Sequence, residues 1–180
     1  MLCSESGMLP SCSNVKGANQ VKQSLLDNPE MLAIVGCKRT RDVALAFRIG
    51  AASSRVMYAL SMPEYIEAWL PAPDAEGLHF LFNPVTQDAF RIDIYRAETL
   101  RTSIYSSCCV VSVNQVRYAW RVASSTGSTE TLIDMRLRDS SDGCILELKH
   151  SGLRDAVDSA WYFRMWNQSL GRLSRLMRKD

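Results

Sequence analysis

The C-terminal segment of this chain, from about Arg154, constrains its fold most, because the spacing of apolar residues there changes from every second residue to every third or fourth. From Arg154 to Arg178 the apolar positions recur at alternating steps of four and three, which places them on one face of an α-helix. These positions are Ala156, Ala160, Phe163, Trp166, Leu170, Leu173 and Met177, with Arg164, Gln168, Gly171, Arg175 and Lys179 on the opposite face. The sequence therefore predicts one long amphipathic helix over about 154–178.

Upstream of this helix, most segments alternate apolar and polar residues with a period of two. They predict strands over 43–49, 78–82, 89–95, 102–113, 115–122, 130–138 and 144–150. Such alternation indicates a sheet with one buried and one solvated face. After the first strand we expect two short helices, over 54–60 and 63–70. Ser53 is the expected cap of the first, and Ser61-Met62-Pro63-Glu64 resembles a capping box for the second.

These elements predict one α+β domain over residues 41–180, with an antiparallel sheet of about six to seven strands packed on the C-terminal helix. A sheet with one apolar face and a helix with one apolar face can bury both by packing together. Residues 1–40 begin rich in Ser, Gly and Pro and are weakly helical over 19–26 and 29–35. We expect them to form a partly ordered N-terminal extension.

Composition excludes several classes of function. A net charge of +2 with scattered basic residues does not predict nucleic-acid binding. No apolar run reaches the ~18 residues needed to span a bilayer, and no signal peptide is visible, so we expect a cytoplasmic protein. The six cysteines form no C-x-x-C pair and there are only two histidines, so we expect neither a metal site nor a cofactor. The cysteines are interpreted as small apolar residues in a reducing compartment, with a redox role for adjacent Cys108 and Cys109 as the alternative.

Three groups of residues resemble a known family. The segment Ala51–Trp69 resembles the opening of the activator of heat-shock-protein-90 ATPase homologue-like family, which belongs to the START-like, or polyketide cyclase-like (SRPBCC), superfamily. The segment Leu148–Leu153 is similar to the closing strand of that family, and Trp166, Leu170 and Leu173 match its last helix. The resemblance covers about 43–177. It implies a helix-grip fold, in which a curved antiparallel sheet wraps around the long C-terminal helix.

The resemblance also implies a cavity between the concave face of the sheet and the helix. Alternation places the candidate cavity residues on the inward face, and the helices supply the others. The candidates are Trp69, Phe90, Ile92, Tyr118, Trp120, Met135, Tyr162 and Trp166. Such aromatic and aliphatic side chains also serve simply as core, and for any one of them core packing is the simpler interpretation. Binding of a small hydrophobic or amphipathic molecule is the function that we expect from this cavity.

Two other functions remain open. The first is an enzyme of the cyclase or hydrolase type that uses polar cavity groups such as Tyr118 and His150, although His150 at a strand end favours a structural hydrogen bond. No carboxylate pair for acid–base catalysis is apparent, because Asp93, Asp134 and Glu147 are expected on the outer face. The second is a chaperone cofactor that binds a protein partner, as the family's name implies. An exposed strand edge or the N-terminal extension could also mediate a homodimer.

Overall fold

The computed structural model describes residues 31–34, 42–70, 77–86, 88–124 and 127–178, and from β2 onward its elements follow the predicted order. The strands are β1 (Met31–Ile34), β2 (Val43–Ile49), β3 (Leu78–Thr86), β4 (Ala89–Arg96), β5 (Thr99–Val111), β6 (Gln115–Ser124), β7 (Gly127–Ser140) and β8 (Gly143–Ser151). The helices are α2 (Ser53–Ser61), α3 (Pro63–Trp69) and α4 (Ala156–Met177). The strands form one antiparallel sheet in the order β1-β2-β8-β7-β6-β5-β4-β3.

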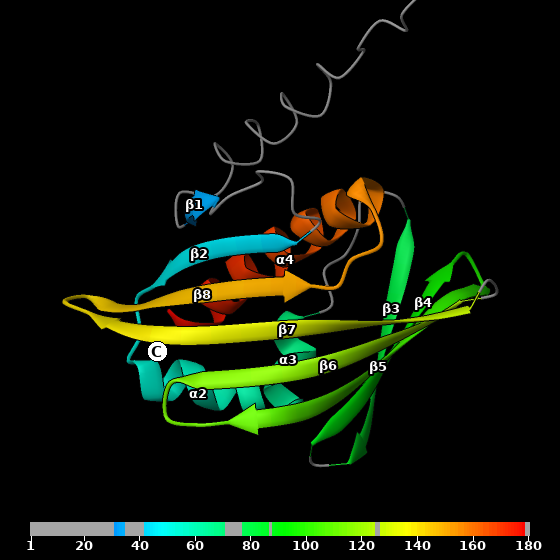
Figure 1. Cartoon of the computed structure of the whole chain (residues 1–180). Helices are drawn as coiled ribbons and strands as arrows, with labels where there is room; N and C mark the ends of the chain where they lie inside the picture. The colour runs from blue at the N-terminus through cyan, green and yellow to red at the C-terminus, as the bar shows by residue number, and fades with distance from the viewer. Residues whose placement is uncertain (1–30, 35–41, 71–76, 87, 125–126, 179–180) are drawn as a thin grey trace, which may run out of the picture.

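The sheet curves, and all three helices lie on its concave side (Figure 1). Its inward side chains pack with those of α2, α3 and α4 into one hydrophobic core. This arrangement is the helix-grip fold that the sequence predicts, and the seven strands β2 to β8 match the seven predicted ones. Among the described residues, no helix is long and apolar enough to cross a membrane.

Strand β1 corrects the weak helix that the sequence predicts over 29–35. It pairs antiparallel with β2, so that Ala33 lies opposite Ala46 and Ile34 opposite Leu45. This pairing supplies hydrogen-bond partners to the edge of β2, a long-range gain that outweighs a weak local helical preference. Most of the predicted N-terminal extension, the predicted helix over 19–26 and the three cysteines Cys3, Cys12 and Cys37 lie outside the described residues. Within them, Cys108, Cys109 and Cys144 form no disulfide bond.

Helix α4 confirms the predicted long C-terminal helix, but its buried face is rotated at the start. Trp166, Leu170 and Leu173 are fully buried, as predicted. The alanines at 156 and 160 are exposed instead of buried, because the larger Trp161 and Tyr162 turn toward the sheet and bury more apolar area. Gly171, expected on the exposed face, is buried together with Ser169, whose hydroxyl donates to the Leu70 carbonyl just after α3 (2.6 Å). The buried surface of α4 is therefore wider than the predicted single stripe.

Asp155 fixes the first turn of α4 in place. Its side chain accepts hydrogen bonds from the backbone N–H groups of Val157 (2.8 Å) and Asp158 (2.9 Å). We expect Asp155→Ala to lower the free energy of unfolding by about 1 kcal/mol, because two helix-terminal donors lose their acceptor. Urea denaturation followed by circular dichroism measures this change. Asp155→Asn should restore most of the loss, and an alanine variant as stable as the wild type would contradict the capping role.

The caps predicted for the two short helices are wrong, although the helices themselves are confirmed. Ser53 is the first residue of α2 and not its cap, and no side chain caps that helix. The predicted capping box before α3 does not form, because Ser61 ends α2 and its hydroxyl donates back to the Met57 carbonyl (2.9 Å). Pro63 opens α3 as predicted, since its fixed φ suits a first helical position.

One carboxylate on the outer face of the sheet is buried instead of solvated as expected. Asp93 is only 4% exposed, because neighbouring polar side chains cover it. Asn83 (3.1 Å), Arg91 (3.0 Å) and Ser103 (2.6 Å) all donate hydrogen bonds to its carboxylate. Asp93 thus links β3, β4 and β5 through hydrogen bonds. This structural role explains why a carboxylate is buried on a strand.

Candidate ligand-binding site

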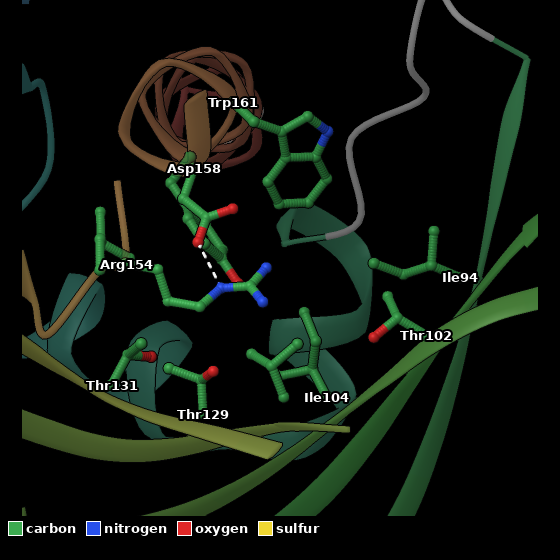
Figure 2. A pocket seen from close by; sticks show the side chains of 11 residues that line it. Ile94, Thr102, Ile104, Thr129, Thr131, Arg154, Asp158 and Trp161 are labelled. Carbon is green, nitrogen blue, oxygen red and sulfur yellow. Dashed lines mark hydrogen bonds and ion pairs between the residues drawn. The ribbon is translucent and has the colours of Figure 1, made fainter. Parts of the chain in front are cut away.

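A pocket of about 210 Å³ lies between the sheet and the beginning of α4. Its walls come from β4, β5, β6, β7, the loop that precedes α4 and the first turns of α4 itself. The lining residues are Ile94, Thr102, Ile104, Val122, Thr129, Thr131, Leu153, Arg154, Asp158, Trp161 and Tyr162. Figure 2 shows the strand side chains facing Asp158 and Trp161 of α4 across an open space.

The pocket exists because the inward side chains at this end of the sheet are short. Thr102 lies opposite Ile94 on the neighbouring strand, and Val122 lies opposite both Ile104 and Thr129. All five are aliphatic or hydroxyl-bearing side chains without a ring, so they fill less of the space beneath α4 than aromatic residues would. Further along the same face, large aromatic rings close that space.

An ion pair stands at the polar side of the pocket. The Arg154 Nε atom donates to the Asp158 carboxylate at 3.0 Å, one helical turn apart in the chain. Figure 2 shows the Arg154 side chain extending from the loop across the pocket, with its guanidinium between Asp158 and the strands. The Arg154 side chain is 54% exposed and that of Asp158 is 25% exposed, so the pair contributes little to stability. It does make this side of the pocket polar without giving it a net charge.

A chain of buried hydrogen bonds leads from α4 to the pocket through His150. The Trp166 indole N–H donates to His150 Nδ1 (3.0 Å), and His150 Nε2 lies 2.9 Å from the Thr131 hydroxyl oxygen. His150 is fully buried, and desolvation lowers its pKa to about 3, so the ring is neutral at physiological pH. The structural hydrogen bond expected of His150 is therefore present, at the base of the pocket wall.

Of the eight predicted cavity residues, Tyr162 lines this pocket. The other seven are buried in the adjoining core: Trp69, Phe90, Ile92, Tyr118, Trp120, Met135 and Trp166. Trp120 stacks on Trp166 with ring centroids 5.3 Å apart, and the Tyr118 hydroxyl donates to the Leu60 carbonyl at 2.6 Å. The five candidates on strands point inward as alternation predicts, and the three on helices are buried as well. The contact of any of the eight with a ligand stays a prediction.

The alternation of residues in the sequence already places two of the pocket threonines on the inward face of the sheet. Thr131 and Thr129 continue, two residues at a time, the same inward row that contains Ile133 and Met135. The predicted cavity residues are mostly aromatic and include neither of these threonines, although small side chains are the ones that leave space. Arg154, Asp158 and Trp161 carry no comparable signal, because their place depends on how α4 meets the sheet.

Comparison with solved structures shows the same fold in several bacterial proteins. Protein CV1439 from Chromobacterium violaceum matches with a TM-score of 0.64 and 21% identity, over 77% of this chain and 99% of that one. The AHSA1 (SPO3351) protein from Silicibacter pomeroyi matches with a TM-score of 0.62 and 18% identity, over 75% and 96%. DynU16, a protein in the dynemicin biosynthetic locus, matches with a TM-score of 0.57 and 16% identity, over 77% and 48%.

No family model matches the chain, and no curated protein matches it. At these identities the likeness to solved structures concerns the fold. The chain therefore has the helix-grip fold that its sequence resemblance implies, and its function has to be argued from its own pocket.

Proposed function

We propose that this protein binds a small apolar or amphipathic molecule in the pocket between strands β4 to β7 and the beginning of α4. The pocket itself supports the proposal: most of its lining is apolar, and a few hydroxyl and charged groups converge on it. That combination is typical of small-molecule sites, in which apolar walls supply affinity and a few polar groups fix orientation. The residues that do so here are Ile94, Ile104, Val122, Leu153 and Trp161 as walls, with Thr131 as a polar contact.

The volume of the pocket limits the size of its ligand. Sites for drug-sized molecules begin at about 300 Å³, and this pocket is smaller, at about 210 Å³. An apolar cavity of about 150 Å³ is large enough for benzene. The ligand that fits is therefore a molecule with a single ring, or a short acyl chain, and not a sterol or a polycycle.

Tyr118 and His150 are the polar groups expected to act if the protein were an enzyme, and neither lines the pocket. The proton of the Tyr118 hydroxyl is used in a hydrogen bond to the Leu60 carbonyl, and burial raises the pKa of this phenol far above its usual value. His150 stays neutral because burial lowers its pKa to about 3. Both side chains are placed to support the core, which favours binding over acid–base catalysis by these two residues.

Filling the pocket tests the proposal. Val122 is half-buried and lines the pocket from β6, so Val122→Phe would place a ring in the space that a ligand needs. We expect this variant to lose at least about tenfold in affinity for any single-ring compound that binds the wild type, because ligand and side chain then compete for one volume. Binding is measured by ligand-observed NMR titration with a panel of single-ring compounds that includes α-methylstyrene.

Leu132→Phe is the matched control. Leu132 lies on β7 and is 36% exposed, between inward-facing Thr131 and Ile133, so its side chain points to the outer face of the sheet. The same aliphatic-to-aromatic change there should leave binding unchanged. Unaltered binding by a folded Val122→Phe variant would refute the proposed site.

A further inference from the structure

We infer that the pocket prefers neutral single-ring ligands with a hydrogen-bond acceptor oxygen, such as an aryl ketone, because it presents the Thr131 hydroxyl as a donor. This inference rests on the proposed function and specifies its ligand class. Three features of the structure carry it: the direction of the buried hydrogen bonds, the surroundings of Thr131, and the charges at the pocket.

Trp166 sets the direction of the hydrogen bonds. An indole N–H can only donate, so the His150 Nδ1 atom that lies 3.0 Å from it must be an acceptor without a proton. The proton of a neutral imidazole is then on Nε2, which donates to the Thr131 oxygen 2.9 Å away. The Thr131 hydroxyl consequently accepts from His150 and keeps its own proton for another partner.

Because of what surrounds Thr131, the acceptor for its hydroxyl proton has to come from the pocket. Thr131 is 6% exposed and lines the pocket. Within the part of the chain that the structure describes, His150 is the only hydrogen-bond partner of its hydroxyl. Thr102, another threonine of the lining, differs because its hydroxyl already donates to the Ala123 carbonyl at 2.7 Å. A buried donor without an acceptor is unfavourable, so an acceptor oxygen on the ligand should be preferred to a hydrocarbon group of the same shape.

The charges at the pocket favour a neutral acceptor over an anion. Arg154 is the only cation among the lining residues, and it is paired with the Asp158 carboxylate, which lines the same pocket. A ligand carboxylate near Arg154 would also approach Asp158, and like charges repel. A ketone, aldehyde or ester oxygen can accept from Thr131 without that repulsion.

Two isosteric probes test the inference directly. Acetophenone and α-methylstyrene have nearly the same shape, and only acetophenone has an acceptor oxygen. We expect the wild-type full chain to bind acetophenone about fivefold more tightly in an NMR titration. Thr131→Val should abolish this preference and still bind α-methylstyrene, whereas the matched control Thr102→Val should retain the preference.

Trp166→Phe tests whether the relay positions Thr131. Without the indole N–H, His150 can carry its proton on Nδ1, and Nε2 can then accept from Thr131. The preference for acetophenone should fall in this variant while the affinity for α-methylstyrene changes less; an undiminished preference would refute the role of Trp166.

If the wild type binds both probes equally, or if Thr131→Val keeps the preference, the inference is wrong while the proposed site stands. If neither probe binds the wild type, the inference is refuted. The proposed function fails as well if no other compound of the single-ring panel binds.

Discussion

Gly143→Ala is expected to lower the free energy of unfolding by at least about 4 kcal/mol, among the largest effects of any single substitution in this chain. Gly143 opens β8 with φ at +143°, a conformation that residues with a side chain rarely adopt. A Cβ atom there would overlap the carbonyl oxygen of Ile49 and lie 2.8 Å from the amide nitrogen of Ala51. Both obstacles are backbone atoms, one at the end of β2 and one in the turn before α2, so relief would require the β7–β8 hairpin to move away from β2.

Gly50→Ala is the control, because Gly50 lies in the same contact. The nearest atom to its added Cβ would be the Asp142 carbonyl oxygen at 4.0 Å, an ordinary van der Waals distance. We expect a change within about 1 kcal/mol. Urea denaturation of both variants, followed by circular dichroism, makes the comparison. Equal losses for the two glycines would contradict the tight approach of β8 to the end of β2.

His150→Gln is expected to remove a large part of the acid sensitivity of the protein. The pKa of His150 is lowered to about 3 in the folded state from the ordinary 6.5, because burial disfavours the charged ring. Above pH 6.5 the ring is neutral in both states. As the pH falls below 6.5 the unfolded chain binds a proton that the folded chain does not, so stability is lost until the pH reaches about 3.

The expected size of this pH effect on the free energy of unfolding follows from the binding of one proton. A single group contributes at most about 1.4 kcal/mol per pH unit, which amounts to roughly 2–3 kcal/mol between pH 7.5 and 4.5. Glutamine can still accept from Trp166 and donate to Thr131, and it does not titrate in this range. We expect the variant to be less stable at pH 7.5, with a shallower dependence of the unfolding free energy on pH. Parallel curves for the two proteins would show that His150 does not stay neutral on folding.

The strands and α4 could be predicted because each depends on a local pattern. Alternation at Gln115–Ser124 and the three-and-four spacing that contains Trp166 and Leu170 require only the residues of one element. The capping prediction at Ser61 failed although it is also local, because that serine belongs to the preceding helix. Strand β1 was missed because its conformation is decided by β2, which lies further along the chain.

The pocket was only partly predictable, for a related reason. The inward direction of Tyr118 and Trp120 follows from alternation, but whether their rings meet a ligand or one another depends on how close α4 approaches. Trp120 and Trp166 meet in the core, and the empty space lies one row further, over Val122 and Thr129. A sequence shows which side chains point inward; the remaining volume is a property of the packed fold.

The most direct test of the proposed site is electron density in the pocket. Crystals of the full chain purified from cells should show a small molecule, with one ring or a short acyl chain, between Trp161 and the β4 to β7 strands. Crystals soaked with acetophenone should show its ring in the same place. In the soaked crystals its oxygen should lie within hydrogen-bond distance of Thr131. A pocket that holds only water in both crystals, or acetophenone bound elsewhere with the pocket closed, would contradict the proposal that this space binds a ligand.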